Sequence, residues 1–305
     1  MVNMRVIKKQ KGKKFYFYLQ YSFREDGKVV TKEKYLGREI PKNIEAVKEE
    51  FGKEQKNKIL FKLDNIKSHF QKEWSRLPES VKEKELEEIS IAFTYNTNAI
   101  EGSTITLSEA REILQDKIAP KKLLGDIKET ETHAKIFLEM LSKNQKPAKE
   151  LILEWHKRIF GETKHDIAGV FRNYMIRVGS YVAPDWQDVK ELIKEFFAFI
   201  NSSPLNSVEL SARAHYRFEK IHPFGDGNGR IGRLIMNHIL WHSGYPMIII
   251  EYKKRRAYYK ALEKDEENFV KYFIRKYLSI FSKSEAFRNL EEAKLLPRHK
   301  KLLGS

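Results

Sequence analysis

The richest concentration of reactive side chains lies between Ile221 and Arg233, in the run IHPFGDGNGRIGR. Three alternating glycines let successive backbone N–H groups turn toward one point, and the helix expected after them adds the positive end of its dipole. Such a loop binds anions, phosphate above all. His222 has an unperturbed pKa near neutrality, so it can accept a proton from an attacking hydroxyl. The run therefore predicts phosphoryl or nucleotidyl transfer.

Three charged side chains of this run suit that chemistry. Arg230 and Arg233 lie three residues apart in the first turn of the expected helix, so both guanidinium groups can face one polyphosphate. Asp226 is a hard oxygen ligand beside the glycines. Because Mg²⁺ commonly binds through one or two carboxylates plus substrate phosphates, we expect Mg²⁺ at Asp226.

The glycines allow other interpretations. Gly227, Gly229 and Gly232 formally match the dinucleotide fingerprint, with Glu251 about twenty residues further on, but that site requires a strand before the glycines. The preceding apolar residues repeat at helical spacing instead, and no Gly-Lys-Ser/Thr of a P-loop occurs in the chain. An ordinary loop with a core histidine is the plainest alternative. Under this alternative, the presence of His, Asp, Asn and two Arg within a dozen residues would be a coincidence.

The elements that must position this run are mostly helices. Apolar residues at helical spacing, with Gly and Pro at the breaks, predict helices over 43–77, 79–93, 107–118, 127–141, 148–160, 189–201, 208–221, 230–242, 255–262 and 268–281. Residues 171–183 are the β-like exception in this body, and their Gly179-Ser180 could turn a hairpin. The expected fold class is mainly α, with a short β-hairpin and a small N-terminal β module.

The N-terminal segment differs in composition from the rest. Its first 40 residues hold 11 Lys and Arg against 4 Asp and Glu, which is +7 of the net +16. Aromatic residues, an Asp-Gly turn and a second β-favouring stretch predict a basic β-hairpin module at 1–42. A helical connector at 43–86, a main domain at 87–282 and a basic C-terminal tail at 283–305 follow. Cations beside aromatic rings also permit nucleic-acid binding by 1–40.

Composition excludes several classes of protein. A hydrophobic fraction of 41% over 305 residues predicts a folded chain, and no apolar run approaches the length of a membrane helix. With no cysteine, disulfides, thiolate nucleophiles and sulfur-ligated metals are excluded. The N-terminus lacks a secretory signal, so we expect a cytoplasmic protein without a membrane partner.

The run from His222 to Arg233 resembles the signature of the Fic (Fic/Doc) family, His-x-Phe-x-Asp/Glu-Gly-Asn-Gly-Arg-x-x-Arg, at every specified position. The resemblance extends from about Glu87 to Phe281. It implies a helical domain that transfers AMP from ATP to a Ser, Thr or Tyr hydroxyl of a target protein, with Mg²⁺ required. His222 would deprotonate the hydroxyl and Asp226 would hold the metal.

The same resemblance implies roles for further residues. Phe224 would anchor the loop, and the phosphates would be bound by Gly227, Asn228, Gly229, Arg230 and Arg233. The stretch at 176–183 resembles the family's flap, which pairs with the target backbone through Arg177, Val178, Gly179, Ser180, Tyr181 and Val182. Either Tyr258 or Tyr259 could stack on the base, although each could equally be a packing residue. The family's Asn-bearing loop after this helix is shortened here, which leaves the nucleotide preference open.

A second match lies upstream, where Thr97, Glu101 and Gly102 resemble the family's inhibitory motif, Ser/Thr-x-x-x-Glu-Gly/Asn. The resemblance implies that Glu101 forms a salt bridge with Arg233 and keeps the γ-phosphate out of its productive place. The plain alternative is a helix end with glycine at the cap, and the capping box from Thr106 to Glu109 supports a break there without implying inhibition. Some relatives use the same Glu to remove AMP, so the direction of reaction is open.

Two alternative functions remain from the sequence. In one, the chain is a nucleic-acid-binding or toxin–antitoxin-like regulator whose N-terminal module selects the partner. In the other, the same scaffold transfers a different phosphate-containing group. A homodimer is plausible through the family resemblance alone.

Overall fold

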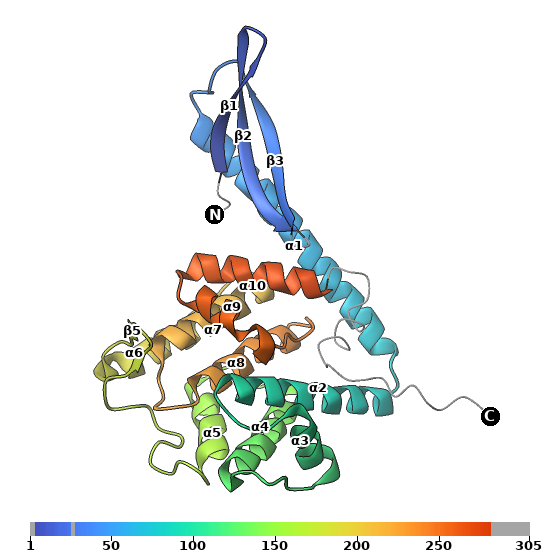
Figure 1. Cartoon of the computed structure of the whole chain (residues 1–305), viewed down its shortest axis with the longest axis vertical. Helices are drawn as coiled ribbons and strands as arrows, with labels where there is room; N and C mark the ends of the chain where they lie inside the picture. Colours follow the sequence, from blue (N-terminus) through green and yellow to red (C-terminus); the bar gives the residue numbers. More distant parts are fainter. Residues whose placement is uncertain (1–3, 26–27, 282–305) are drawn as a thin grey trace, which may run out of the picture.

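The computed structural model describes residues 4–25 and 28–281, without the side chains of 23–25 and 28–29. It is mainly α, as the sequence predicts: a body of packed helices, with a small sheet that lies along one long helix and also contacts the last helix of the body, Glu266–Phe281 (Figure 1). The expected Asp-Gly turn at 26–27 and the expected tail at 283–305 lie outside the described residues.

The N-terminal module has three strands where the sequence predicts two. The strands β1 (Met4–Lys11), β2 (Lys14–Glu25) and β3 (Lys28–Gly37) form one antiparallel sheet in that order. The expected hairpin is β2 and β3, and β1 was missed because half its residues are cationic. Edge strands often carry lysine, which prevents them from pairing with another chain. The sequence of such a strand therefore shows little alternation of apolar and polar residues.

The helix α1 (Ile44–Arg76) belongs to both parts of the molecule. Its Phe51 packs against Leu19 and Tyr21 of the sheet, while Leu63, Ile66 and Phe70 enter the core of the helical body. The segment expected as a connector is therefore one continuous helix whose two ends are buried in different cores.

The helical body is built around one buried helix. Its helices are α2 (Glu79–Ile100), α3 (Leu107–Arg111), α4 (Leu124–Ser142), α5 (Lys149–Phe160), α6 (Val189–Ser202), α7 (Ser207–Ile221), α8 (Asn228–His242), α9 (Arg255–Leu262) and α10 (Glu266–Phe281). Short π and 3₁₀ turns lie at Glu112–Asp116, Trp186–Asp188 and Tyr252–Lys254. Every residue of α8 from Asn228 to Leu240 is buried. A helix that is covered all round holds its N-terminus in a fixed place.

Helix α2 is longer than the sequence predicts, because the polar residues after Phe93 are buried rather than exposed. Thr94 is bonded to Nδ1 of His133 at 3.0 Å, and the Asn96 side chain accepts a bond from the backbone of Tyr252 at 2.8 Å. The helix thus ends at Ile100, with Glu101 as its C-cap and Gly102 at φ +94°. The expected break and the capping box of Thr106 and Glu109 are both confirmed.

The β-like segment of the body forms a very short hairpin. Strands β4 (Arg177–Val178) and β5 (Tyr181–Val182) pair antiparallel, and Gly179 takes φ +59° in the turn. None of the described helices has the length and apolarity needed to cross a membrane.

Candidate active site

The loop between α7 and α8 is shaped by two residues in the left-handed region. His222 ends α7 at φ 50° and ψ 60°, and Gly227 at φ 77° leads into α8. Between them Phe224 is fully buried, and the Asn228 side chain both accepts from and donates to the Phe224 backbone at 2.9 Å. Phe224 is thus placed as the loop anchor that the resemblance implies. The side-chain amide of Asn228 closes the loop, so any phosphate contact by this residue would come from its backbone.

The imidazole of His222 is prepared to accept a proton. Its Nδ1 lies 3.3 Å from the carbonyl oxygen of Glu219, which can only accept, so Nδ1 carries the hydrogen and Nε2 keeps a free lone pair. Burial lowers the pKa of His222 below its usual value, partly offset by that backbone hydrogen bond and by the charge of Glu101. The ring is therefore neutral at physiological pH, which is the state a general base requires.

Arg172 connects the loop between α7 and α8 to the hairpin. This buried guanidinium donates to the carbonyl of His222 at 2.8 Å, to that of Tyr174 at 2.8 Å and to that of Pro184 at 2.7 Å. The last two acceptors flank the hairpin. The residue pattern alone assigned no role to Arg172, whereas in the structure its side chain holds His222 and both ends of the hairpin in fixed relative positions.

His156 of α5 supports the loop from beneath. Its ring stacks on Phe224 with centroids 3.9 Å apart, its Nδ1 accepts from the backbone of Gly169, and its Nε2 contacts the carbonyl of Asp226 at 3.0 Å. Burial lowers the pKa of His156 to about 4, so the ring is a neutral donor to Asp226. No residue pattern pointed to this role, because His156 and Asp226 are 70 positions apart in the chain.

Arg233 of α8 lies in the deepest part of the site, with 1% of its surface exposed. Its Nη2 donates to Oε1 of Glu101 at 2.6 Å and to the carbonyl of Thr97 at 3.2 Å. The predicted salt bridge between Glu101 and Arg233 is confirmed. Gly102 gives the chain its turn away from the site immediately afterwards.

The Glu101 carboxylate also fills the space above the first turn of α8. A Cβ added to Gly229 would lie 2.1 Å from Oε1 of Glu101 and 2.9 Å from Nη1 of Arg233. A helix N-terminus attracts negative charge, and here a carboxylate of the protein itself takes that position. A phosphate group bound at the same place would have to displace it.

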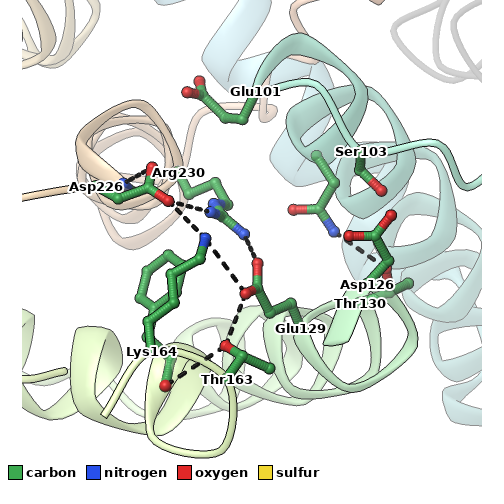
Figure 2. A network of polar contacts seen from close by, with 12 residues as sticks. Glu101, Ser103, Asp126, Glu129, Thr130, Thr163, Lys164, Asp226 and Arg230 are labelled. Carbon is green, nitrogen blue, oxygen red and sulfur yellow. Dashed lines mark hydrogen bonds and ion pairs between the residues drawn. The ribbon is translucent and has the colours of Figure 1, made fainter. Parts of the chain in front are cut away.

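Asp226 and Arg230 belong to a different network, shown in Figure 2. The Arg230 guanidinium is bonded to the carboxylate of Glu129, from α4, and lies 3.7 Å from Oδ2 of Asp226. Lys164 donates to the same Oδ2 at 2.5 Å and lies 3.4 Å from Oε1 of Glu129. Arg230 is buried between two carboxylates, so neutralising a phosphate would require it to leave them.

The two tyrosines offered for the base lie in different surroundings. Tyr258 is 1% exposed; its hydroxyl lies 2.6 Å from Nε2 of His215 and 3.5 Å from Nη1 of Arg233, so it supports the arginine. Tyr259 is 41% exposed and donates to the carbonyl of Ile100 at 3.0 Å. Of the two, only the Tyr259 ring has a face open to a ligand.

The hairpin is exposed beside the loop between α7 and α8. Tyr181 donates its hydroxyl to the carbonyl of Lys220 at 2.8 Å, two residues before His222, while Val178 and Val182 are exposed. Arg177, Gly179 and Ser180 are also exposed. The hairpin is therefore anchored at one end of α7 and free to meet another chain on its outer side.

Comparison with known proteins agrees with the loop and the fold. Residues 146–240 match the family model of the Fic/DOC family. The chain is 33% identical over 201 residues to the protein adenylyltransferase Fic of Aedes aegypti, covering 62% of this chain and 39% of that one. For the protein of the same name from Nematostella vectensis, identity is 34% over 189 residues, covering 59% and 44%. The chain spans less than half the length of these curated relatives.

Solved structures show the same arrangement of helices. Fic-1 of C. elegans (residues 134–508) superposes with a TM-score of 0.65 at 26% identity, covering 82% of this chain and 76% of that one. A Fic domain-containing signaling protein of Bacteroides thetaiotaomicron superposes with a TM-score of 0.63 at 23% identity, covering 76% and 95%, and this likeness concerns the fold alone.

Proposed function

We propose that this chain, which carries a Fic/DOC domain, transfers AMP from ATP to a hydroxyl side chain of a target protein. The observation that carries the proposal is that a neutral His222 lies just before a helix whose N-terminus suits an anion. The same helix carries the buried Arg233. The relatives named protein adenylyltransferase support the same chemistry. Since the chain spans less than half of them, its activity and its target are inferred from its own site.

In the proposed reaction, Nε2 of His222 takes the proton of the target hydroxyl as its oxygen attacks the α-phosphorus. The bond to pyrophosphate breaks, and pyrophosphate leaves. Backbone N–H groups at Gly227 and Gly229 and the start of α8 hold the phosphates, while Arg233 balances their charge. The hairpin at 177–182 would pair with the backbone of the target and set its hydroxyl against the α-phosphate.

Asp226 would hold Mg²⁺ in this reaction, because its donor atoms and its exposure suit the ion. Its carboxylate is the oxygen donor that Mg²⁺ prefers, and the side chain is 42% exposed at the mouth of the loop. Among the residues that the structure describes, no group of three or more His, Cys, Asp or Glu forms a protein cage for a metal. A single carboxylate completed by phosphates and water suits this ion, which when bound would offset the charge of the phosphates.

Glu101 would restrain the reaction. It holds the guanidinium that a nucleotide phosphate needs, and it occupies the space over Gly229. A carboxylate and a phosphate compete for the same fork of donors, so the protein with Glu101 in place would transfer AMP slowly. From its position over Gly229, the same carboxylate would also assist removal of AMP from a modified target.

The test is self-labelling with ATP that carries label on the α-phosphate, with Mg²⁺, in three proteins: wild type, Glu101→Gly, and Glu101→Gly with His222→Ala. We expect strong labelling of Glu101→Gly alone. ATP labelled on the γ-phosphate should label none of them, because pyrophosphate leaves. Label from the γ-phosphate would instead show phosphate transfer, and equal α-labelling with and without His222 would overturn the role of the base.

A second function is favoured by the open face of the N-terminal sheet. One face of β2 packs Leu19 and Tyr21 on α1, so the alternate residues face away from the helix. On that open face Tyr18 and Tyr35 lie with ring centroids 5.3 Å apart, and Tyr16 lies 6.2 Å from Tyr35. Among the residues whose side chains the structure describes, this face carries four cations against one acid, Glu33: the cations are Arg5, Lys9, Lys11 and Lys14.

This combination suits single-stranded nucleic acid, with phosphates on the cations and unpaired bases on the tyrosine rings. On the opposite face of the sheet, which packs on α1, Lys34 lies 3.8 Å from Glu50 of that helix. The carboxylate of Glu33 is already engaged by Lys9 at 2.6 Å and by Gln20 at 3.0 Å. The open face therefore offers an excess of cations to a polyanion.

Fluorescence anisotropy with a labelled single-stranded oligonucleotide tests this second function. Tyr35→Ala should weaken binding by about tenfold, the effect of one lost stacking contact. Phe61→Ala removes an exposed aromatic ring from α1, away from the sheet, and should leave affinity unchanged. Equal affinity of Tyr35→Ala and wild type, or stronger binding to the matching duplex, would overturn the interface.

A further inference from the structure

The charges around Asp226 form a closed ring of alternating sign (Figure 2). Asp226 contacts Lys164 at 2.5 Å, Lys164 contacts Glu129 at 3.4 Å, Glu129 is bonded to Arg230, and Arg230 returns to Asp226 at 3.7 Å. Both oxygens of Asp226 are engaged, because Oδ1 accepts from the backbone of Gly227 at 2.5 Å. The carboxylate that the proposed function assigns to Mg²⁺ is thus already neutralised by cations of the protein.

The two cations of this ring differ in how firmly they are held. Arg230 is buried, is bonded to Glu129 and lies over the Phe160 ring at 4.3 Å. Lys164 comes from the turn after α5, its side chain is 35% exposed, and its Nζ lies 4.9 Å from the same ring. A lysine carries a compact charge on a flexible stem, so Lys164 can move away from Asp226 at little cost, whereas Arg230 cannot.

Lys164 also has a second carboxylate to move to. Oε1 of Glu129 lies 3.4 Å from its Nζ and is fixed by a hydrogen bond from Thr163 at 2.7 Å. Released from Oδ2 of Asp226, the ammonium would keep this partner and its place over Phe160. The exchange therefore leaves no buried charge unpaired, which is the main cost of breaking a buried ion pair.

We propose that Lys164 is a tethered cation that a divalent metal must displace from Asp226, so that this lysine sets the metal affinity of the site. The inference rests on the proposed function, because it takes Asp226 as the metal ligand. A monovalent ammonium at 2.5 Å from Oδ2 occupies one of the directions from which a metal would approach and repels it. Mg²⁺ would bind firmly only when it arrives with the negative charge of a nucleotide.

The test is a titration of the full chain with Mn²⁺ alone, without nucleotide, followed by electron paramagnetic resonance of the free ion. Lys164→Ala should bind Mn²⁺ at least fivefold more tightly than wild type. The matched control is Lys128→Ala, which removes the same charge from the neighbouring helix, where Lys128 pairs with the exposed Glu162. It should match wild type within twofold. A thermal melt of each variant checks that the fold is retained.

The outcomes separate this inference from the function on which it rests. If Asp226→Asn abolishes Mn²⁺ binding and Lys164→Ala leaves it unchanged or weaker, the competition is refuted while Asp226 keeps its role. If Asp226→Asn leaves Mn²⁺ binding unchanged, both the metal site and the role of Lys164 are refuted. Tightening by Lys164→Ala that Lys128→Ala reproduces would show a long-range charge effect and would also refute the inference.

Discussion

Two arginines in the first turns of α8, three residues apart, each pair with a glutamate from another helix, yet the two pairs are built differently. Glu101 is the C-cap of α2, next to a glycine that turns the chain away. Glu129 lies inside α4, with Arg230, Thr163 and Lys164 around it. A carboxylate on a helix end can be displaced by a small backbone movement, whereas one within a packed helix cannot. The Arg233–Glu101 pair therefore suits the proposed regulation of AMP transfer, and the Arg230–Glu129 pair suits structural support of the loop.

The largest expected effect is a loss of stability when the Arg230–Glu129 pair is broken. Glu129→Ala leaves the buried Arg230 without its main partner, so it should lower the free energy of unfolding by about 3–5 kcal/mol. Chemical denaturation measures this directly. Glu101→Ala should cost clearly less, because Arg233 keeps the carbonyl of Thr97 and the hydroxyl of Tyr258. Equal losses in the two variants would contradict the comparison.

The two pairs should also differ in their effect on catalysis. Glu101→Gly should raise the rate of AMP transfer by at least tenfold, since it frees Arg233 for phosphate. Glu129→Gln keeps the shape of the side chain but loosens Arg230 and Asp226, so it should lower the rate. Initial rates of self-labelling at fixed ATP compare the two variants. A rise in both would mean that the glutamates act alike.

The pH profile of transfer should report the protonation of His222, the proposed base. Burial lowers the pKa of His222, and only its neutral form accepts a proton. The rate of Glu101→Gly should therefore fall as pH drops through a value below 6.5 and stay level above it. The profile of kcat/KM from pH 5 to 8.5 measures this. An acidic limb centred above pH 6.5 would indicate a different base or a His222 that is charged at rest.

The smallest effect is expected at the hairpin. Tyr181→Phe removes the hydrogen bond to Lys220 beside the catalytic loop, a loss of about 1 kcal/mol in anchoring. It should weaken modification of a target by a few-fold and leave ATP binding unchanged. Separate titrations of target and of ATP distinguish the two. A change confined to ATP binding would remove the hairpin from target docking.

The sequence predicted the parts of the site that are local in the chain. The loop from His222 to Arg233 is one segment, so residue types and spacing suffice, and the motif resemblance placed Glu101 against Arg233. The supporting network could not be predicted in this way. Glu129 lies 101 positions before Arg230, and Lys164 lies 62 positions before Asp226, so only the packing of α4 and α5 brings them together. Arg230 consequently has two carboxylate partners where spacing alone suggested phosphate.

The fold, like the site, could be predicted only in part from local sequence patterns. Helices of the body follow from apolar periodicity, because one face of each is buried. The end of α2 was placed seven residues too early, since its buried Thr94, Asn96 and Asn98 have polar partners in other elements. The strand β1 was missed because a lysine-rich edge has no apolar alternation. Polar residues that are buried, and edge strands that are exposed, are where a sequence pattern carries the least information.

The most direct test of the central claim, that Glu101 takes the place of a nucleotide phosphate on Arg233, is a comparison of ATP and AMP affinities by calorimetry. The proteins are wild type and Glu101→Gly, both carrying His222→Ala so that no transfer occurs. We predict that removing Glu101 tightens ATP binding by about tenfold and changes AMP binding by less than twofold, because AMP lacks the outer phosphates. Equal tightening of both nucleotides, or no change for ATP, would contradict the account.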